Sequence, residues 1–259
     1  MNPMLKVEGI SKTYGAFVAV QDVSFEVNTG ELVAIIGPNG AGKSTCFNML
    51  SGQHHPSAGR VWLEGRDITR AKPREIWRMG VGRTFQIAAT YHSMTVVENV
   101  EMALLSRERR LYHMWKPASA FCRDEALSLL DSIGMAGQAH RPCSELAYGD
   151  IKRLELAIAL ANRPRLLLMD EPAAGMGPRE RNELMALTKR LVTERDMAVL
   201  FTEHSMDVVF AYADRTVVLA RGKLIAEGTP PQVRANPRVQ EVYFGSGKSF
   251  EAQGEEVLA

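Results

Sequence analysis

The stretch "GPNGAGKST" at residues 37–45 decides the fold of this chain. It follows the apolar run "LVAII" at 32–36 and leads into a segment with helical periodicity at Ser44–Ser51. A glycine-rich loop between a buried strand and a helix gathers backbone N–H groups around a phosphate. The sequence therefore predicts a phosphate-binding loop (P-loop) carried by an α/β sheet.

The residue types of this loop match the parts of a bound nucleotide. Its three glycines let the backbone curl so that successive N–H groups point inward. Lys43 adds a charge against the β- and γ-phosphates, Ser44 offers a hydroxyl to Mg²⁺, and Thr45 can reach the α-phosphate. The predicted cradle comprises Gly37, Pro38, Asn39, Gly40, Ala41, Gly42, Lys43, Ser44 and Thr45.

Two adjacent acids end the apolar run "LLLMDE" at 166–171. Asp170 would be costly at the end of a buried strand unless it is paired or lies near a metal, so we interpret it as a carboxylate that orients Mg²⁺ and its waters. Glu171 lies at the carboxyl end of the same strand, where α/β folds place ligands. A carboxylate there can take a proton from an attacking water.

The composition sets limits on the class of protein. The chain has 259 residues and a net charge of +1, which gives no reason to expect nucleic-acid binding. Three cysteines without metal-ligand spacing indicate reduced thiols. No apolar run reaches the ~18–20 residues that span a bilayer, and the N-terminus lacks a secretory pattern. We therefore expect a cytoplasmic chain that meets a membrane only through a partner.

The fold class expected from hydrophobic patterning is α/β. The alternating segments near the N-terminus and at 60–68 predict an antiparallel β subdomain. Continuous apolar runs alternating with helices predict a mostly parallel sheet, the P-loop NTPase (RecA-like) core. Its expected strands are at 32–37, 165–171, 197–204 and 216–223, and its expected helices are Ser44–Ser51, Pro178–Arg195 and Ser205–Ala213.

Residues from about 87 to 162 read as a helical subdomain inserted in this core, within a single nucleotide-binding domain at 1–245. Inside it, the basic and partly aromatic stretch at 107–123 is interpreted either as a solvated loop or as a contact to a partner protein or lipid headgroups. We expect the polar tail at 246–259 to be flexible.

Together these motifs resemble the nucleotide-binding subunits of ABC transporters, in their expected order from Tyr14 to about residue 245. "KTYGAF" is similar to the A-loop, so Tyr14 would stack on adenine, and "GRTFQ" to the Q-loop, with Gln86 near Mg²⁺ and the lytic water. "MDEPAAGMGP" combines the Walker B strand end with the D-loop. "FTEHSMD" resembles the switch region, with His204 at the γ-phosphate.

A second anion site follows from the same resemblance. "ELAYGDIKRLELA" at 145–157 looks like the family signature, and a helix start with a glycine suits an anion. In this family two ATPase subunits pack head to tail, so the signature residues of one chain serve the γ-phosphate held by the P-loop of the other. The signature residues are Ala147, Tyr148, Gly149 and Asp150.

Three residues depart from the family pattern. Ala147 replaces a serine, so backbone N–H groups from Tyr148 to Ile151 would have to contact the phosphate. Asp150 replaces Glu or Gln, and we expect it to cap its own helix. Gly177 replaces the D-loop aspartate or asparagine, which predicts weaker coupling between the two ATP sites.

The resemblance implies an ATP-hydrolysing importer subunit that uses ATP and Mg²⁺. Lys43, Gln86, Glu171 and His204 would be its catalytic residues, and Ser44, Gln86 and Asp170 its metal site. Finer features favour branched-chain or other hydrophobic amino acids as the solute. The alternatives are an importer of urea or short amides and a non-transport ABC switch. The implied partners are permeases, an identical or paralogous ATPase and, indirectly, a periplasmic binding protein, on the inner face of a bacterial membrane.

Overall fold

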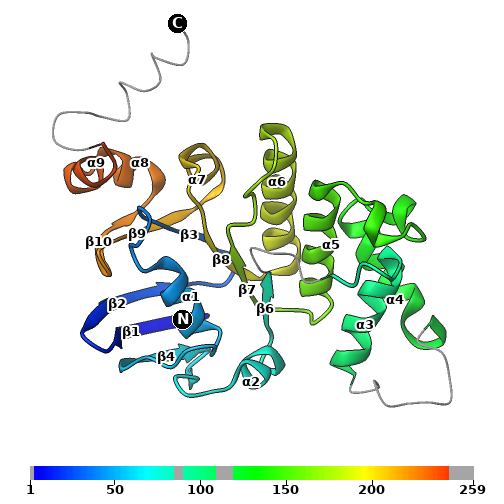
Figure 1. The fold of residues 1–259 in the computed structure, drawn as a ribbon, viewed down its shortest axis with the longest axis horizontal. Coiled ribbons are helices and arrows are strands. Elements are labelled where there is room, and N and C mark those ends of the chain that lie inside the picture. The colour runs from blue at the N-terminus through cyan, green and yellow to red at the C-terminus, as the bar shows by residue number, and fades with distance from the viewer. Residues whose placement is uncertain (1–2, 85–89, 109–118, 245–259) are drawn as a thin grey trace, which may run out of the picture.

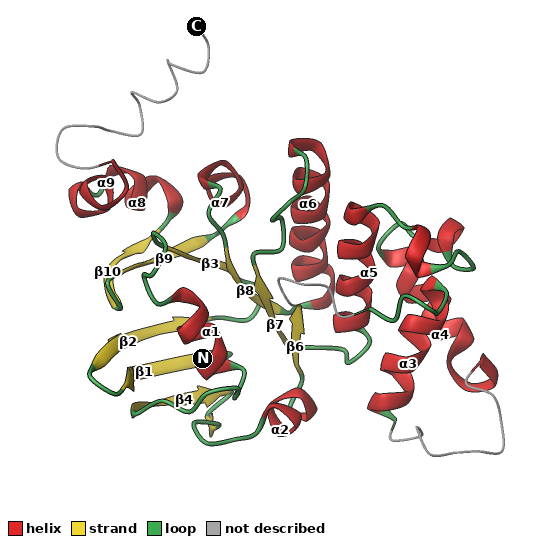
Figure 2. Cartoon of the chain, in the orientation of Figure 1, coloured by secondary structure: helices red, strands yellow, loops and turns green. Residues whose placement is uncertain are grey.

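The computed structural model describes residues 3–84, 90–108 and 119–244. Two sheets and a set of helices make up this part of the chain (Figure 1). Figure 2 shows most of the helices above and to one side of the sheets, with α1 (Lys43–Leu50) between the two sheets and one short helix, Pro73–Arg78, below them. Within the described residues, no helix combines the length and apolar character needed to cross a bilayer.

The larger sheet has six strands in the order β10-β9-β3-β8-β7-β6. All neighbours pair in parallel except β10, which pairs antiparallel with β9 at one edge. The strands are β3 (Leu32–Ile36), β6 (Val81–Thr84), β7 (Leu166–Asp170), β8 (Ala198–Thr202), β9 (Arg215–Ala220) and β10 (Lys223–Gly228). Because parallel strands end at one edge, the loops after β3, β7 and β8 meet there.

Both faces of this sheet are covered, which explains why its strands lack polar alternation. On β3, Leu32, Ala34 and Ile36 join the core formed with the helices. Val33 and Ile35 point to the opposite face and join the core beneath α1. All five residues are fully buried.

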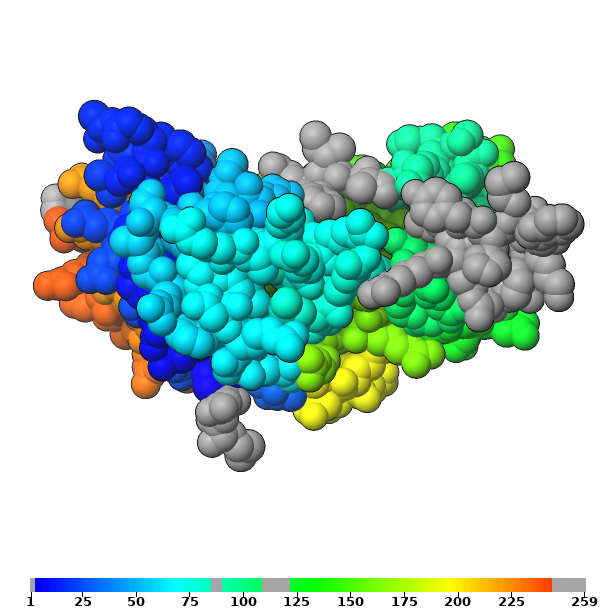
Figure 3. All heavy atoms as spheres, turned by 90° about the horizontal axis from the view of Figure 1, so that it is seen from below, coloured from blue at the N-terminus to red at the C-terminus, as the bar shows by residue number. Residues whose placement is uncertain are grey.

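The smaller sheet is antiparallel, in the order β2-β1-β4-β5, as the alternating segments predicted. Its strands are β1 (Leu5–Tyr14), β2 (Phe17–Val27), β4 (Ala58–Leu63) and β5 (Arg66–Asp67). The buried face of β1 and β2 packs on α1, where Phe47 is completely buried. Figure 3 shows the side of the molecule on which the residues around β4 and α2 (Pro73–Arg78) lie between the N-terminal strands and the helices.

The remaining helices fall into two groups. Between β6 and β7 lie α3 (Val96–Arg107), α4 (Ser119–Ser132), the short helices η1 (Ala136–Gln138) and η2 (Cys143–Glu145), and α5 (Tyr148–Leu160). Along the rest of the core lie α6 (Pro178–Arg195), α7 (Met206–Tyr212), α8 (Pro230–Ala235) and α9 (Pro237–Phe244). The limits of an inserted subdomain at 87–162, and the character of the tail at 246–259, stay predictions.

Two strands of the larger sheet were not predicted as such. β6 carries Arg83 in a four-residue segment, too short and too polar for a continuous apolar run. β10 pairs antiparallel across a turn at Gly222, whose φ of 76° suits glycine. The predicted helix Pro178–Arg195 has the same limits as α6, with Pro178 at its first turn.

An ionic cluster ties three of the helices together. Arg107 on α3 binds Glu125 on α4 through two hydrogen bonds of 2.8 Å and donates to the carbonyl of Ala161 just after α5. Arg163 adds a third contact to Glu125, at 3.0 Å. The hydrogen bonds from Arg107 lower the pKa of Glu125 to about 2, with Arg163 adding to that effect and burial opposing it.

Replacing Glu125 by Gln should lower the free energy of unfolding by about 1 kcal/mol at pH 7, a modest value because the pair is partly exposed. The folded-state pKa lies below the ordinary glutamate pKa of 4.5, so the contribution is complete above about pH 4.5 and is lost as the pH falls toward 2. Urea denaturation of wild type and E125Q at a series of pH values measures it. Asp124→Asn, at the exposed neighbouring acid, is the control. A difference that stays constant with pH would contradict this assignment.

Candidate nucleotide-binding site

The P-loop is a tight structure in which two positions require glycine. At Gly37, with φ of 154°, an added Cβ would lie 2.2 Å from the carbonyl oxygen of Leu219 on β9. Gly42, with φ of 99°, precedes α1, and an added Cβ there would lie 2.7 Å from the carbonyl oxygen of Ala19. The neighbouring strands therefore press on the loop from two sides, and only glycine fits.

Lys43 is held inside this loop. Its Nζ donates to the carbonyl oxygens of Gly37 at 2.7 Å and Pro38 at 3.2 Å, and the residue is only 6% exposed. Burial lowers the pKa of Lys43, while the charges of Glu171 and Asp170 oppose that effect. The ammonium thus stands at the centre of the site, bound to carbonyls that a phosphate can replace.

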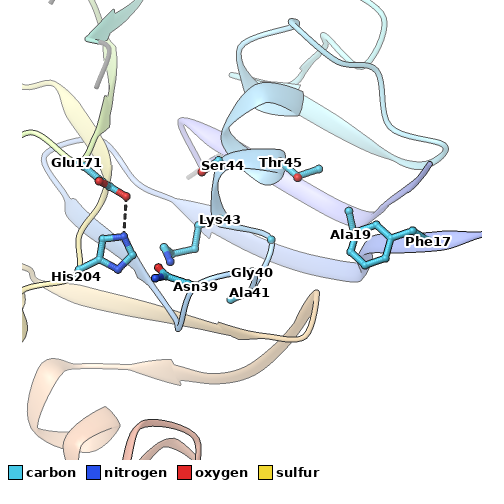
Figure 4. Close-up of a pocket in the computed structure, with 11 residues that line it drawn as sticks. Phe17, Ala19, Asn39, Gly40, Ala41, Lys43, Ser44, Thr45, Glu171 and His204 are labelled. Atoms are coloured by element: carbon cyan, nitrogen blue, oxygen red, sulfur yellow. Dashed lines mark hydrogen bonds and ion pairs between the residues drawn. The ribbon is translucent and has the colours of Figure 1, made fainter. Parts of the chain in front are cut away.

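A pocket of about 240 Å³ opens over the loop (Figure 4). Its lining comes from the β2 edge, the P-loop and the ends of β7 and β8. The residues are Phe17, Ala19, Asn39, Gly40, Ala41, Gly42, Lys43, Ser44, Thr45, Glu171 and His204. Seven of the nine cradle residues predicted from the motif, Asn39 to Thr45, line the pocket.

Hydrogen bonds organise the two acids at the end of β7. Thr202 on β8 donates its hydroxyl to Asp170 at 2.8 Å, and its oxygen accepts the backbone N–H of Glu171 at 3.0 Å. Arg83 on β6 lies 3.7 Å from the Asp170 carboxylate and binds Asn48 of α1 at 3.0 Å. Asp170 is thus paired, as its position in a buried strand required.

Glu171 and His204 meet across the pocket. Nε2 of His204 donates to Oε1 of Glu171 at 2.6 Å, the dashed line in Figure 4. Glu171 adopts a left-handed backbone conformation with φ of 47°, uncommon for a residue with a side chain. Such outliers concentrate at functional sites, where the surrounding structure holds them.

Sequence reasoning overlooked Glu203, the residue before His204. Its carboxylate accepts backbone N–H groups from Ala173 at 3.2 Å, from His204 at 2.9 Å and from Ser205 at 3.2 Å, and the residue is 5% exposed. One buried acid thereby joins the loop after β7 to the loop after β8. Its position directly after the apolar run of β8 could have predicted a buried acid that needs hydrogen-bond donors.

The structure separates the two aromatic residues at the turn of the β1–β2 hairpin, Tyr14 and Phe17. Phe17 is 66% exposed and lines the pocket. Tyr14 is not among the lining residues: its ring meets His54 edge-on with centroids 6.1 Å apart, and the ammonium of Lys12 lies 5.3 Å from its centroid. Stacking of Tyr14 on adenine stays a prediction, and Phe17 is a pocket-lining aromatic residue that the sequence reasoning missed. Gln86 lies outside the described residues.

The signature segment differs from expectation at its helix start. α5 begins at Tyr148 after Ala147, so Gly149 lies inside the first turn. Of the four N–H groups expected to contact a phosphate, Tyr148 to Ile151, that of Ile151 already bonds the carbonyl of Ala147 at 3.0 Å. The N–H groups of Tyr148, Gly149 and Asp150 are left for an anion. The predicted cap by Asp150 is wrong, because its carboxylate instead accepts from Gln138 at 2.9 Å.

The start of α6 borders the signature. A Cβ on Gly149 would lie 3.1 Å from a carboxylate oxygen of Glu180, and a Cβ on Gly175 would lie 3.2 Å from the ring of Tyr148. Gly177, with φ of −64°, precedes α6 and donates to Glu180 at 3.3 Å. The signature and D-loop of one chain are thus neighbours, outside the P-loop pocket.

Comparison with known proteins fits this geometry. Residues 20–174 match the family described as ABC transporter. The chain belongs to the ABC transporter family. Residues 223–249 match a second family, described as branched-chain amino acid ATP-binding cassette transporter. The P-loop NTPase fold and the ATPase assignment predicted from the motifs are confirmed.

Individual relatives match this chain over nearly its whole length. It is 39% identical to the high-affinity branched-chain amino acid transport ATP-binding protein LivG of Salmonella typhimurium over 94% of this chain and 98% of that protein. It is 39% identical to BraF of Pseudomonas aeruginosa, of the same description, with the same coverage.

Two solved structures define the fold comparison. The ADP conformation of MJ1267, an ATP-binding cassette of an ABC transporter, has a TM-score of 0.85 and 32% identity, covering 95% of this chain and 100% of that one. The dimeric structure of MJ0796, a bacterial ABC transporter cassette, has a TM-score of 0.75 and 26% identity, covering 88% and 99%.

The positions of the two aromatic residues generate a test. Because Phe17 lines the pocket, Phe17→Ala should raise the Kd for Mg-ATP about tenfold, as expected for a lost stacking contact of roughly 1–2 kcal/mol. Tyr14→Ala should have the smaller effect. Equilibrium titration with a fluorescent ATP analogue measures both. If Tyr14→Ala weakens binding more than Phe17→Ala, the base stacks on Tyr14.

Proposed function

We propose that this chain is the ATP-hydrolysing subunit of an ABC importer for branched-chain or other hydrophobic amino acids. The observation that carries the proposal is the hydrogen bond of 2.6 Å between Glu171 and His204 over the P-loop. It joins the proposed general base to the proposed switch histidine beside the P-loop. The match of residues 223–249 to the branched-chain family, and the descriptions of LivG and BraF, support the solute class.

The reaction proposed is in-line attack of water on the γ-phosphate. Phosphoryl transfer depends on positioning and charge neutralisation more than on covalent chemistry. Lys43 leaves the carbonyls of Gly37 and Pro38 and neutralises phosphate charge. Glu171 takes the proton of the attacking water. His204 and Gln86 position the γ-phosphate and the water.

The residues present fit a magnesium ion. Mg²⁺ in nucleotide sites is bound by one or two protein oxygens with substrate phosphates and waters. The Ser44 hydroxyl lines the pocket, and the Asp170 carboxylate is fixed at the neighbouring strand end by Thr202. With Gln86 these groups would hold the ion, which supplies charge neutralisation to the phosphates.

The second subunit completes the site. In the proposed head-to-tail pair, the N–H groups of Tyr148, Gly149 and Asp150 face the γ-phosphate held by the P-loop of the other chain. The dimeric description of MJ0796 supports such pairing. The other ATPase is either a second copy of this chain or a paralogue.

The permease contact is proposed at a second pocket, of about 360 Å³, between α2, β6 and α5. Ile76, Trp77, Val81 and Ile158 give it an apolar lining, and Arg83 links it to Asp170. We expect a helical segment of a permease to occupy this pocket, whose lining residue Arg83 precedes Gln86 by three positions in the sequence. The assembly would sit on the inner face of the cell membrane and receive solute from a periplasmic binding protein.

Two alternatives are weaker. An importer of urea or short amides would use the same ATPase site, and only the relatives' descriptions favour amino acids. A non-transport switch that binds ATP without hydrolysing it has no use for the contact between Glu171 and His204.

Replacing Glu171 by Gln should reduce the ATPase rate at least a hundredfold, the scale of a general base, while Mg-ATP binding is retained. Phosphate release measures the rate, and equilibrium titration measures the binding. Glu183→Gln, at an exposed acid on α6, is the control and should keep the wild-type rate. Near-wild-type hydrolysis by E171Q would remove Glu171 from its role.

Restoring asparagine at position 177 should raise the Hill coefficient for ATP hydrolysis, because a side chain that communicates between the two sites returns to the D-loop. The structure has room for it, since a Cβ there meets only Glu180, at 3.9 Å. Asparagine also suits the first position before a helix, so folding should be preserved. An unchanged Hill coefficient in the paired ATPase would exclude the coupling role.

A further inference from the structure

The buried carboxylate of Glu203 lies between the two loops that carry the proposed reacting residues. The ladder between β7 and β8 ends at the pair Asp170 and Thr202. Glu171 and Glu203 are the next residues along the two chains. The ladder therefore stops just before the residues proposed to act on the γ-phosphate, and the side chain of Glu203 continues the connection from there.

One oxygen of this carboxylate holds the loop after β7. Oε1 of Glu203 accepts the backbone N–H of Ala173 at 3.2 Å. Ala173 lies in a turn that begins at Glu171, because the N–H of Ala174 donates to the Glu171 carbonyl at 3.1 Å. The left-handed backbone of Glu171, with φ of 47°, persists only where the surrounding structure holds it. The contact at Ala173 is one of those that hold this turn.

The other oxygen holds the loop after β8. Oε2 of Glu203 accepts the backbone N–H groups of His204 at 2.9 Å and of Ser205 at 3.2 Å. The Ser205 hydroxyl in turn accepts from Arg181 on α6 at 2.9 Å. Because Glu203 is only 5% exposed, losing its carboxylate would remove acceptors that bulk water does not replace at no cost.

The proposed base and the proposed switch histidine are therefore held by one side chain. Nε2 of His204 and Oε1 of Glu171 are 2.6 Å apart over the pocket (Figure 4), and this distance depends on how the two loops lie relative to each other. A displacement of about 1 Å in a reacting group can lower a rate about a hundredfold. Glu203 is not among the described residues that line the pocket, so it can act only through its neighbours.

We propose that Glu203 is a positioning residue for ATP hydrolysis: its carboxylate fixes the loop that carries Glu171 against the loop that carries His204. The inference rests on the proposed function, in which Glu171 takes the proton of the attacking water and His204 positions the γ-phosphate. The P-loop makes no hydrogen bond to Glu203 among those found in the described residues, so turnover should depend on Glu203 and ADP binding should not.

Glu203→Gln tests this with little change in side-chain size. Glutamine has one acceptor oxygen, and its NH₂ group would face an N–H on the other loop, so only one of the two loops can stay bound. In the paired ATPase, kcat should fall about ten- to a hundredfold. The Kd of the full chain for Mg-ADP, measured by calorimetry, should stay within about twofold of wild type. Hydrogen exchange should become faster at Ala173, or at His204 and Ser205, and stay unchanged in the P-loop.

Two further variants separate positioning from charge and from general stability. Glu203→Asp keeps the charge and both oxygens but is one methylene shorter, so it cannot reach both loops, and its kcat should fall at least about fivefold. Val192→Ala removes buried methyl groups on α6, and should lower Tm while kcat stays within about twofold.

The outcomes distinguish this inference from the proposed function. Near-wild-type hydrolysis by Glu171→Gln would overturn the proposed function. If Glu171→Gln is inactive but Glu203→Gln or Glu203→Asp keeps the wild-type kcat, only the role of Glu203 is overturned. The same holds if Val192→Ala loses as much kcat as Glu203→Gln at an equal loss of Tm, or if Glu203→Gln weakens Mg-ADP binding as much as it lowers kcat.

Discussion

The shared edge at which the parallel strands end is the constraint on which the site depends. β3 delivers the P-loop, β7 delivers Asp170 and Glu171, and β8 delivers Thr202 and His204 to that edge. No side chain needs a long reach, because neighbouring strands place these groups in adjacent rows. Because β3 is buried on both faces, its position in the sheet is fixed, and so is the point at which the P-loop begins at Gly37. A shift of one residue in β3 would exchange the residues facing its two cores.

Charge in the site is balanced before nucleotide arrives. Lys43 is buried on the carbonyls of its own loop, and the two acids after β7 lie close enough to raise its pKa against the effect of burial. Asp170 has Thr202 and Arg83, and Glu171 has His204. Each group therefore has a partner that a phosphate or a metal ion can replace. Such exchange costs less free energy than leaving a buried charge unpaired.

Much of this could be predicted from sequence because the informative residues are contiguous. "GPNGAGKST" and "LLLMDE" each carry a strand, a turn and the reacting groups in one short segment. Glu203 and Phe17 were missed for the opposite reason: their places in the structure come from contacts with residues far away in the chain. Glu203 binds the N–H of Ala173, and Phe17 lines one pocket with His204, over separations that no local pattern records. The cap expected of Asp150 failed because Gln138, from a neighbouring turn, takes its carboxylate.

The signature segment bears on the proposed pairing of two chains. Its three N–H donors lie outside the P-loop pocket, and Ala147 offers no hydroxyl to strengthen them. The Glu180 carboxylate lies beside Gly149, so the proposed anion site includes a negative charge of its own. A phosphate carrying only its own charge would be held weakly there. A phosphate already neutralised by Lys43 of another chain would be accepted more readily, because less negative charge is then brought near Glu180. Closure of two chains would therefore depend on nucleotide being seated in the P-loop first.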